Sequence, residues 1–200
     1  RLALQALWRG PPVLLAPRGD TPTQRFVTAV AFSPDGSGIV TVGQDGTARL
    51  WETATGAIVH ALQGHTDQVF GAAFSPDGQY VFTSGFDSTI RAWDSATGTE
   101  LGSIATGGRG VFGIDLTSDG AVLAAGGDAV TLWNVQTGEI IQIFEGDTDW
   151  LRSIAWSPDG GTIAVGSGAS VVLWNAATGE PLQTLGEDLS ILTYSVAWSP

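Results

Sequence analysis

Two histidines and a recurring aspartate are the side chains of this 200-residue chain whose types suit acid–base or metal chemistry. His65 follows a glycine in a loop, and His60 falls within a run that predicts an outer strand. A lone histidine is a candidate general base or metal ligand. Nucleophilic catalysis also needs a serine or cysteine held by such a base, and no motif here supplies one. We therefore interpret His65 as a structural histidine.

The recurring aspartates belong to turns. Each stands third in a Ser-Pro-Asp-Gly sequence or a close relative of it, at Asp35, Asp77, Asp119 and Asp159. Serine, proline and glycine at these positions are typical of a type I turn. Calcium needs about six to eight oxygen ligands gathered around one ion, which one aspartate per turn does not provide. We expect turns rather than calcium sites, and no metal or cofactor.

A second pattern shows which elements carry these residues. Four tryptophans recur after 42, 40 and 41 residues, at Trp51, Trp93, Trp133 and Trp174. A Thr-Gly turn follows each one, and short apolar runs lie between the turns. Because the runs are too short for helices and the connections are short, each unit predicts four antiparallel strands. One such sheet cannot bury both of its faces, so it needs a neighbour on each side.

These repeats resemble the WD repeat. The residues that carry the resemblance are Gly64-His65, Asp87, Trp93-Asp94 and the Ser-Pro-Asp-Gly turns, and it covers about residues 27–198. The amino-acid sequence of the turns is similar to that of bacterial members of the family. The resemblance implies an all-β WD-repeat β-propeller, in which four-stranded blades stand radially around a central channel.

Counting strands predicts about four complete blades in an open arc rather than a closed ring. Residues 27–193 form the four WD repeats, and residues 194–200 supply the first strand of a further blade. Residues 1–26 are either the third and fourth strands of a partial blade or a proline-rich linker. Because the sequence stops at Ser199-Pro200, within the repeating turn, we expect a fragment whose parent protein closes the ring with further repeats.

The resemblance also implies a series of hydrogen bonds inside each blade. One unit holds the complete set, which consists of His65, Thr83 or Ser84, Asp87 and Trp93. The structural residues that match in the other units are Asp45, Trp51, Trp133 and Trp174. Because their sets are incomplete, we expect packing and shortened turns to hold the last two blades.

Aromatic residues at unusual positions are the candidates for partner binding. In the family these positions rim one face of the channel, which is the usual partner surface. The candidates are Phe70, Phe86, Phe112, Trp150, Arg152 and Tyr194. Large aromatic residues and arginine have the composition of binding hot spots. The alternative is that several of them pack between adjacent blades, which is least expected for Phe86 and Trp150 because both lie in loops.

Charge and composition limit the kinds of partner. The net charge is −12 and there are only eight Lys and Arg, which argues against nucleic acid and anionic membranes. The absence of cysteine excludes disulfides and thiolate metal sites. No apolar run approaches the ~20 residues of a membrane span. The compartment is not indicated, and the cytoplasm is our default expectation.

The function we expect is that of a non-enzymatic scaffold that presents propeller loops to a protein or peptide. By analogy with longer relatives, it is the sensing or regulatory arm of a larger signalling protein. The alternative is a propeller-based enzyme such as a metal-dependent hydrolase.

Overall fold

The computed structural model describes residues 26–144, 151–186 and 192–199. Within these residues the chain forms sixteen β-strands and no helix. The strands group into four antiparallel sheets, each made of four strands that follow one another in the sequence. The prediction of an all-β fold with four complete four-stranded blades is confirmed. We number the sheets blades 1 to 4 in chain order.

The bounds of the strands show how regular the repeat is. Blade 1 consists of β1 (Val27–Phe32), β2 (Gly38–Gly43), β3 (Thr47–Glu52) and β4 (Ile58–Gln63). Blade 2 consists of β5 (Val69–Phe74), β6 (Tyr80–Gly85), β7 (Thr89–Asp94) and β8 (Glu100–Ala105). Blade 3 consists of β9 (Gly113–Leu116), β10 (Val122–Gly126), β11 (Val130–Asn134) and β12 (Ile140–Phe144). Blade 4 consists of β13 (Leu151–Trp156), β14 (Thr162–Ser167), β15 (Ser170–Asn175) and β16 (Pro181–Leu185).

The Ser-Pro-Asp-Gly turns join the first strand of each blade to the second. In blade 2 the Ser75 hydroxyl donates to Asp77 Oδ1 at 2.6 Å, and Gly78 N donates to the Ser75 carbonyl at 2.9 Å. Gly78 takes a φ of +72°, a conformation that side chains with a Cβ disfavour. The aspartate therefore fixes its own turn.

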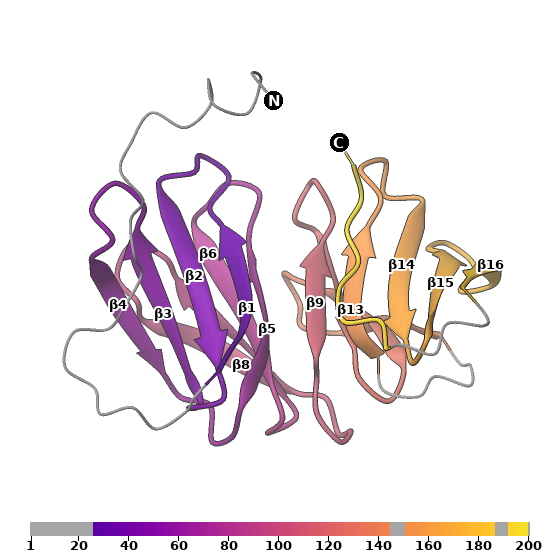
Figure 1. Ribbon diagram of the computed structural model, residues 1–200, viewed down its shortest axis with the longest axis horizontal. Coiled ribbons are helices and arrows are strands. Elements are labelled where there is room, and N and C mark those ends of the chain that lie inside the picture. The colour runs from indigo at the N-terminus through magenta and orange to yellow at the C-terminus, as the bar shows by residue number, and fades with distance from the viewer. Residues whose placement is uncertain (1–25, 145–150, 187–191, 200) are drawn as a thin grey trace.

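The blades are arranged radially, with their first strands innermost. Strands β1, β5, β9 and β13 lie side by side in the middle of the molecule, while β4 and β16 lie at its opposite sides (Figure 1). This order is that of a propeller, in which each blade covers the faces of its neighbours.

The core consists of three apolar layers, one at each junction between blades. Each tryptophan packs toward the blade before its own: Trp93 against blade 1, Trp133 against blade 2 and Trp174 against blade 3. Trp93 is 1% exposed. A buried tryptophan removes roughly 150–250 Å² from water, which stabilises the fold by about 4–6 kcal/mol as an upper bound. The repeat therefore places one large anchor at every junction.

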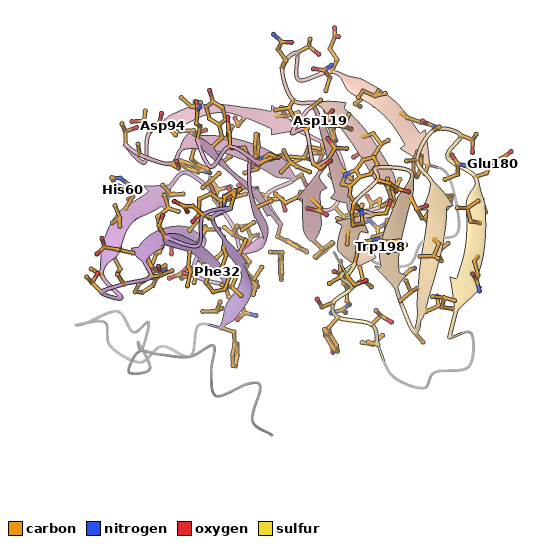
Figure 2. All side chains as sticks on the ribbon, turned by 90° about the horizontal axis from the view of Figure 1, so that it is seen from above. Phe32, His60, Asp94, Asp119, Glu180 and Trp198 are labelled. Atoms are coloured by element: carbon orange, nitrogen blue, oxygen red, sulfur yellow. The ribbon has the colours of Figure 1, made fainter. Side chains whose placement is uncertain are left out.

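The four blades form an open arc. Figure 2 shows Phe32 of blade 1 and Trp198 of the C-terminal segment at the two ends of the arc. Phe32 is 64% exposed and Val30 is 58% exposed, because no described blade covers this side of β1. The described part of the chain contains no helix with the length and apolarity that a membrane crossing requires.

The two ends of the chain differ from the central repeats. Residues 192–199 form no strand, although we expected a first strand at 194–200. They follow β13 through single bonds, from Val196 N to the Ser153 hydroxyl at 3.0 Å and from the Trp198 indole to the Ala155 carbonyl at 3.0 Å. In the complete blades the first strand pairs with a second strand of the same blade, and none follows among the described residues. The partial blade or linker expected at 1–26 lies outside them, except for Phe26.

Candidate functional site

Three phenylalanine rings meet where the first strands of blades 2 and 3 begin. The ring centroids of Phe70 and Phe112 are 5.2 Å apart, those of Phe86 and Phe112 are 5.9 Å apart, and those of Phe70 and Phe86 are 6.3 Å apart. We call these three residues the aromatic cluster. The ring planes are tilted or edge-on, which is the favoured arrangement of aromatic pairs. Phe86 is 38% exposed and the other two are half-buried, so the cluster is open to solvent.

A β-bulge explains why these positions face outward. In blade 2 Val69 pairs with Gly85 and Gly71 pairs with Ser84, which leaves Phe70 as the extra residue between them. The same shift in blade 4 leaves Arg152 between Leu151 and Ser153. A bulge re-aims the side chain of its extra residue. We chose Phe70 and Arg152 as candidates by counting back from the turns. Both are the extra residue of a bulge, which is why their side chains differ in direction from those of a regular strand.

The loop that carries Phe86 is held against the start of blade 3. Phe86 N donates to the Gln68 carbonyl at 2.8 Å, and Val111 N donates to the Gly85 carbonyl at 3.0 Å. Gly110 has a φ of +128°, and a Cβ on it would lie 3.2 Å from Cα of Phe86. The absence of a side chain at Gly110 therefore allows the chain to pass close over Phe86.

Arg152 and Tyr194 form a second set beside the aromatic cluster. The Arg152 guanidinium carbon lies 5.2 Å from the centre of the Tyr194 ring, and Tyr194 is 68% exposed. The two sets are neighbours, because Phe112 and Arg152 belong to adjacent first strands. Gly113, which follows Phe112, packs against the backbone of Arg152: a Cβ at Gly113 would lie 3.4 Å from the Arg152 carbonyl oxygen. Trp150, the remaining candidate, lies outside the described residues. The structure thus brings five of the six candidates to the same end of three adjacent first strands, β5, β9 and β13.

The structural set of blade 2 forms a continuous series of hydrogen bonds. The Trp93 indole donates to Thr83 Oγ1 at 2.9 Å, and Nε2 of His65 lies 2.8 Å from the same oxygen. Nδ1 of His65 lies 2.9 Å from Oδ2 of Asp87. Thr83 rather than Ser84 is the member on the second strand, and the buried hydroxyl of Ser84 has no partner among the described residues. Both ring nitrogens of His65 are therefore engaged within the blade.

Burial and hydrogen bonding set the charges of this series. Burial lowers the pKa of His65 below its ordinary value of 6.5, although Asp87 opposes that effect. Burial alone would raise the pKa of Asp87, but hydrogen bonds from Thr66 N, His65 and Thr89 outweigh it and hold the pKa below its ordinary value. The pair therefore favours a neutral imidazole beside an ionised carboxylate.

The other blades keep parts of the series. In blade 1 the Trp51 indole donates to Thr41 Oγ1 at 2.8 Å, and Asp45 pairs with Arg49 at 2.8 Å. In blade 3 the Trp133 indole turns to Thr131, on its own strand, at 2.8 Å. The indole N–H of Trp174 in blade 4 is buried without a partner among the described residues.

Strand register explains why the Trp174 indole lacks a partner. In blade 1 Trp51 pairs with Ile39, and Thr41 lies two residues further along the same strand. Thr83 of blade 2 holds the same position relative to Val81, which pairs with Trp93. Val165 occupies that position in blade 4, and Val172 stands where blade 3 has Thr131. Neither valine carries a hydroxyl, so the fourth blade depends on packing.

Asp115 is a half-buried carboxylate that the sequence reasoning passed over. It accepts Trp156 N from the next blade at 2.7 Å and Leu116 N at 2.9 Å. Burial raises its pKa, and the two backbone hydrogen bonds oppose that rise. Aligning the turns would have found it, because the matching residues of the other units are alanines: Ala31, Ala73, Ala155 and Ala197. Asp115 ties β9 to β13 on the channel side.

Family comparison agrees with this geometry. The WD domain, G-beta repeat family matches residues 18–52, 56–94 and 138–175, more than half of the chain. The chain belongs to the WD-repeat family. The repeat that ends at Trp133 is outside the matched segments, and it is the blade whose indole turns to Thr131.

Two curated relatives share single repeats with this WD-repeat chain. Human WD repeat-containing protein 86 is 50% identical over 40 residues, which cover 20% of this chain and 11% of that protein. Dynein assembly factor with WD repeat domains 1 from Xenopus laevis is 41% identical over 44 residues, which cover 22% of this chain and 11% of that protein. Both relatives are eukaryotic. The chain thus matches about a tenth of the length of either relative.

Among the described residues, no group of three His, Cys, Asp or Glu side chains is placed to hold a metal ion.

Proposed function

We propose that this WD-repeat chain is a non-enzymatic interaction module that binds a protein or peptide at the aromatic cluster, with Arg152 and Tyr194 at its side. The observation that carries the proposal is the solvent-open contact of Phe70, Phe86 and Phe112, which belong to two different blades. Partly exposed aromatic rings beside an arginine have the composition of binding hot spots. WD repeats generally act as protein-interaction scaffolds, and we infer the same class of role for this chain.

The larger protein in which the module works is a second part of the proposal. We infer that the chain serves as the sensing or regulatory arm of a signalling protein, with further repeats that complete the ring. The exposed side of β1, with Phe32 64% exposed, supports the need for a covering element. A hydrolase would require metal-binding side chains grouped together, and nothing among the described residues favours that alternative.

Selection of peptides from a phage-displayed library on the wild-type protein tests the binding surface. Selected peptides are then measured against Phe86→Ala and against Tyr80→Ala, since both residues are 38% exposed but Tyr80 lies at the other end of blade 2. We expect Phe86→Ala to weaken binding by about tenfold, as truncation of a hot-spot ring does, and Tyr80→Ala to leave it unchanged.

Two results would overturn the proposal. Equal losses in the two variants would show that the peptides bind elsewhere. A melting temperature of Phe86→Ala lowered as far as that of a core truncation would show that the ring serves packing between blades. Calorimetric titration of the wild type with Mg²⁺, Mn²⁺ and Zn²⁺ tests the hydrolase alternative, because tight stoichiometric binding would favour it.

A further inference from the structure

A groove of about 740 Å³ lies at the junction of blades 1 and 2, beside the Ser-Pro-Asp-Gly turns. Its floor is apolar, with Leu50 5% exposed and Phe74 half-buried, and Val59 of β4 forms part of its wall. Ligand pockets commonly measure roughly 300–1,000 Å³. Phe70 is the second residue of β5 and Phe74 is its last, so the groove lies at the opposite end of the blade from the aromatic cluster.

Three carboxylates line this groove, and none of the described residues in its lining is a cation. Asp35 and Asp77 belong to the turns of blades 1 and 2, and Glu52 ends β3. The ion pairs among the described residues use other carboxylates: Asp45, Asp87 and Glu100. The negative charge beside the apolar floor is therefore not neutralised by Arg, Lys or His from the groove's own lining.

The turn geometry keeps this charge in place. The Ser33 hydroxyl donates to Asp35 at 2.6 Å and Ser37 N donates at 3.0 Å, and these bonds lower the pKa of Asp35 to about 2. Hydrogen bonds from Ser75 and Gln79 N lower the pKa of Asp77 in the same way. Both carboxylates stay ionised well below neutral pH.

A second groove, between blades 2 and 3, lies away from the Ser-Pro-Asp-Gly turns. It measures about 390 Å³, and its described lining consists of apolar and neutral polar residues, among them Leu101, Trp133 and Gln136, without a charged side chain. The carboxylate rim therefore comes with the Ser-Pro-Asp-Gly turns, and the groove that lies away from those turns lacks it.

We propose that the groove between blades 1 and 2 binds a basic peptide segment. An Arg or Lys of the peptide meets Asp35, Glu52 and Asp77, while a neighbouring apolar side chain lies on Leu50 and Phe74. Charge complementarity supports this occupant, because ionised acceptors at the rim suit cationic donors and the long stems of Arg and Lys cover apolar surface. The net charge of −12 also steers a basic partner toward the protein. This site is separate from the aromatic cluster, so either proposal can fail alone.

The test uses the wild-type chain and a fluorescein-labelled peptide of alternating Arg and Leu, followed by fluorescence polarisation. The groove variant is Asp35→Asn with Asp77→Asn. The matched control is Asp119→Asn with Asp159→Asn, because those aspartates hold the same turn bonds in blades 3 and 4, from Thr117 and Ser157 at 2.6 Å, but do not line the groove. Both double variants lose the same charge and the same type of turn bond.

We expect the groove variant to weaken peptide binding by roughly fivefold or more, and the control variant by less than about twofold, since long-range charge alone contributes little at physiological salt. A peptide of alternating Arg and Gly should bind more weakly than the Arg-Leu peptide, because it lacks the apolar contact. Equal losses in the two double variants, equal binding of the two peptides, or no binding to the wild type would each overturn the proposal.

Discussion

Nε2 of His65 lies 2.8 Å from Oγ1 of Thr83, and the same oxygen accepts the indole N–H of Trp93. Because an indole N–H can only donate, the hydroxyl proton of Thr83 is free to point at His65. A neutral imidazole then carries its proton on Nδ1, where it is donated to Asp87 at 2.9 Å. The series runs in one direction from Trp93 to Asp87 and requires an uncharged His65.

The stability of the protein should therefore depend on pH through His65. Its pKa is lowered in the folded state from the ordinary 6.5, chiefly by burial. The unfolded chain binds more protons than the native chain as the pH falls below about 6.5, so stability is lost in that direction. Urea melts from pH 7 to pH 5 should show this loss in the wild type and in His60→Gln, and a flatter profile in His65→Gln. An unchanged profile in His65→Gln would contradict the proposed proton arrangement.

Asp87→Ala should destabilise the protein more than Asp128→Ala. The Asp87 carboxylate accepts hydrogen bonds from Thr66 N, Thr89 N and the Thr89 hydroxyl, besides its contact with His65. Removing it leaves the buried imidazole of His65 without its partner at Nδ1, at a cost of about 2–4 kcal/mol. Asp128 is exposed, and its loss should cost less than about 1 kcal/mol. Equal midpoint shifts in chemical denaturation would count against a special role for Asp87.

A hydroxyl at position 165 should give the Trp174 indole of the fourth blade a hydrogen-bond acceptor. Val165 is 0% exposed and holds the register position from which Thr41 and Thr83 accept a tryptophan N–H. Val165→Thr would offer an acceptor to the unpaired indole of Trp174 and should stabilise the protein by about 1 kcal/mol. Val81→Thr is the control, because Val81 is also 0% exposed but faces Trp93, whose indole is already bonded. We expect that control to be destabilising, and a loss of the same size in both variants would refute the repair.

Gly110→Ala should weaken partner binding through Phe86. The φ of +128° disfavours any Cβ, and the added carbon would lie 3.2 Å from Cα of Phe86. Gly107→Ala is the control, because Gly107 also has a positive φ, +76°, but has open space around its Cβ position. Both variants should lose about 1–2 kcal/mol of stability from backbone strain, and only Gly110→Ala should also reduce the affinity for peptides selected on the wild type. Equal affinities would show that the loop does not position Phe86 for binding.

The repeat explains why so much of the fold followed from sequence. Turn residues have local preferences, and a tryptophan every 40 to 42 residues marks each junction without reference to the rest of the chain. Residues 192–199 form no strand, although their pattern matches the first strands of the complete blades. A strand needs backbone hydrogen bonds from a neighbouring strand, and among the described residues no second strand follows this segment. The choice between Thr83 and Ser84 also needed the structure, since adjacent residues on a strand face opposite sides of the sheet.

In the candidate site, too, the positions set by local sequence could be predicted, whereas the contacts between blades could not. Counting back from the turns selected Phe70 and Arg152, because the bulge lies at the same distance from the turn in blades 1, 2 and 4. The closeness of Phe86 to Phe112 was not visible in the sequence, since it depends on Gly110 and on how two blades pack. Asp115 was missed because its partner, Trp156 N, belongs to the next blade, although the alanines at the matching positions of the other units mark the difference.

The sequence alone determined the class of the fold and the number of complete blades, because turns, strand lengths and the tryptophan period are local properties. The family resemblance implied the one complete hydrogen-bond set, and the structure decided that Thr83 is its member on the second strand. Only the tertiary structure decided which side chains from different blades meet. The aromatic cluster and the carboxylate-lined groove both lie at junctions between blades. Contacts there depend on how one blade is placed against the next, which is set by the summed packing of the apolar layers and is not encoded in any single repeat.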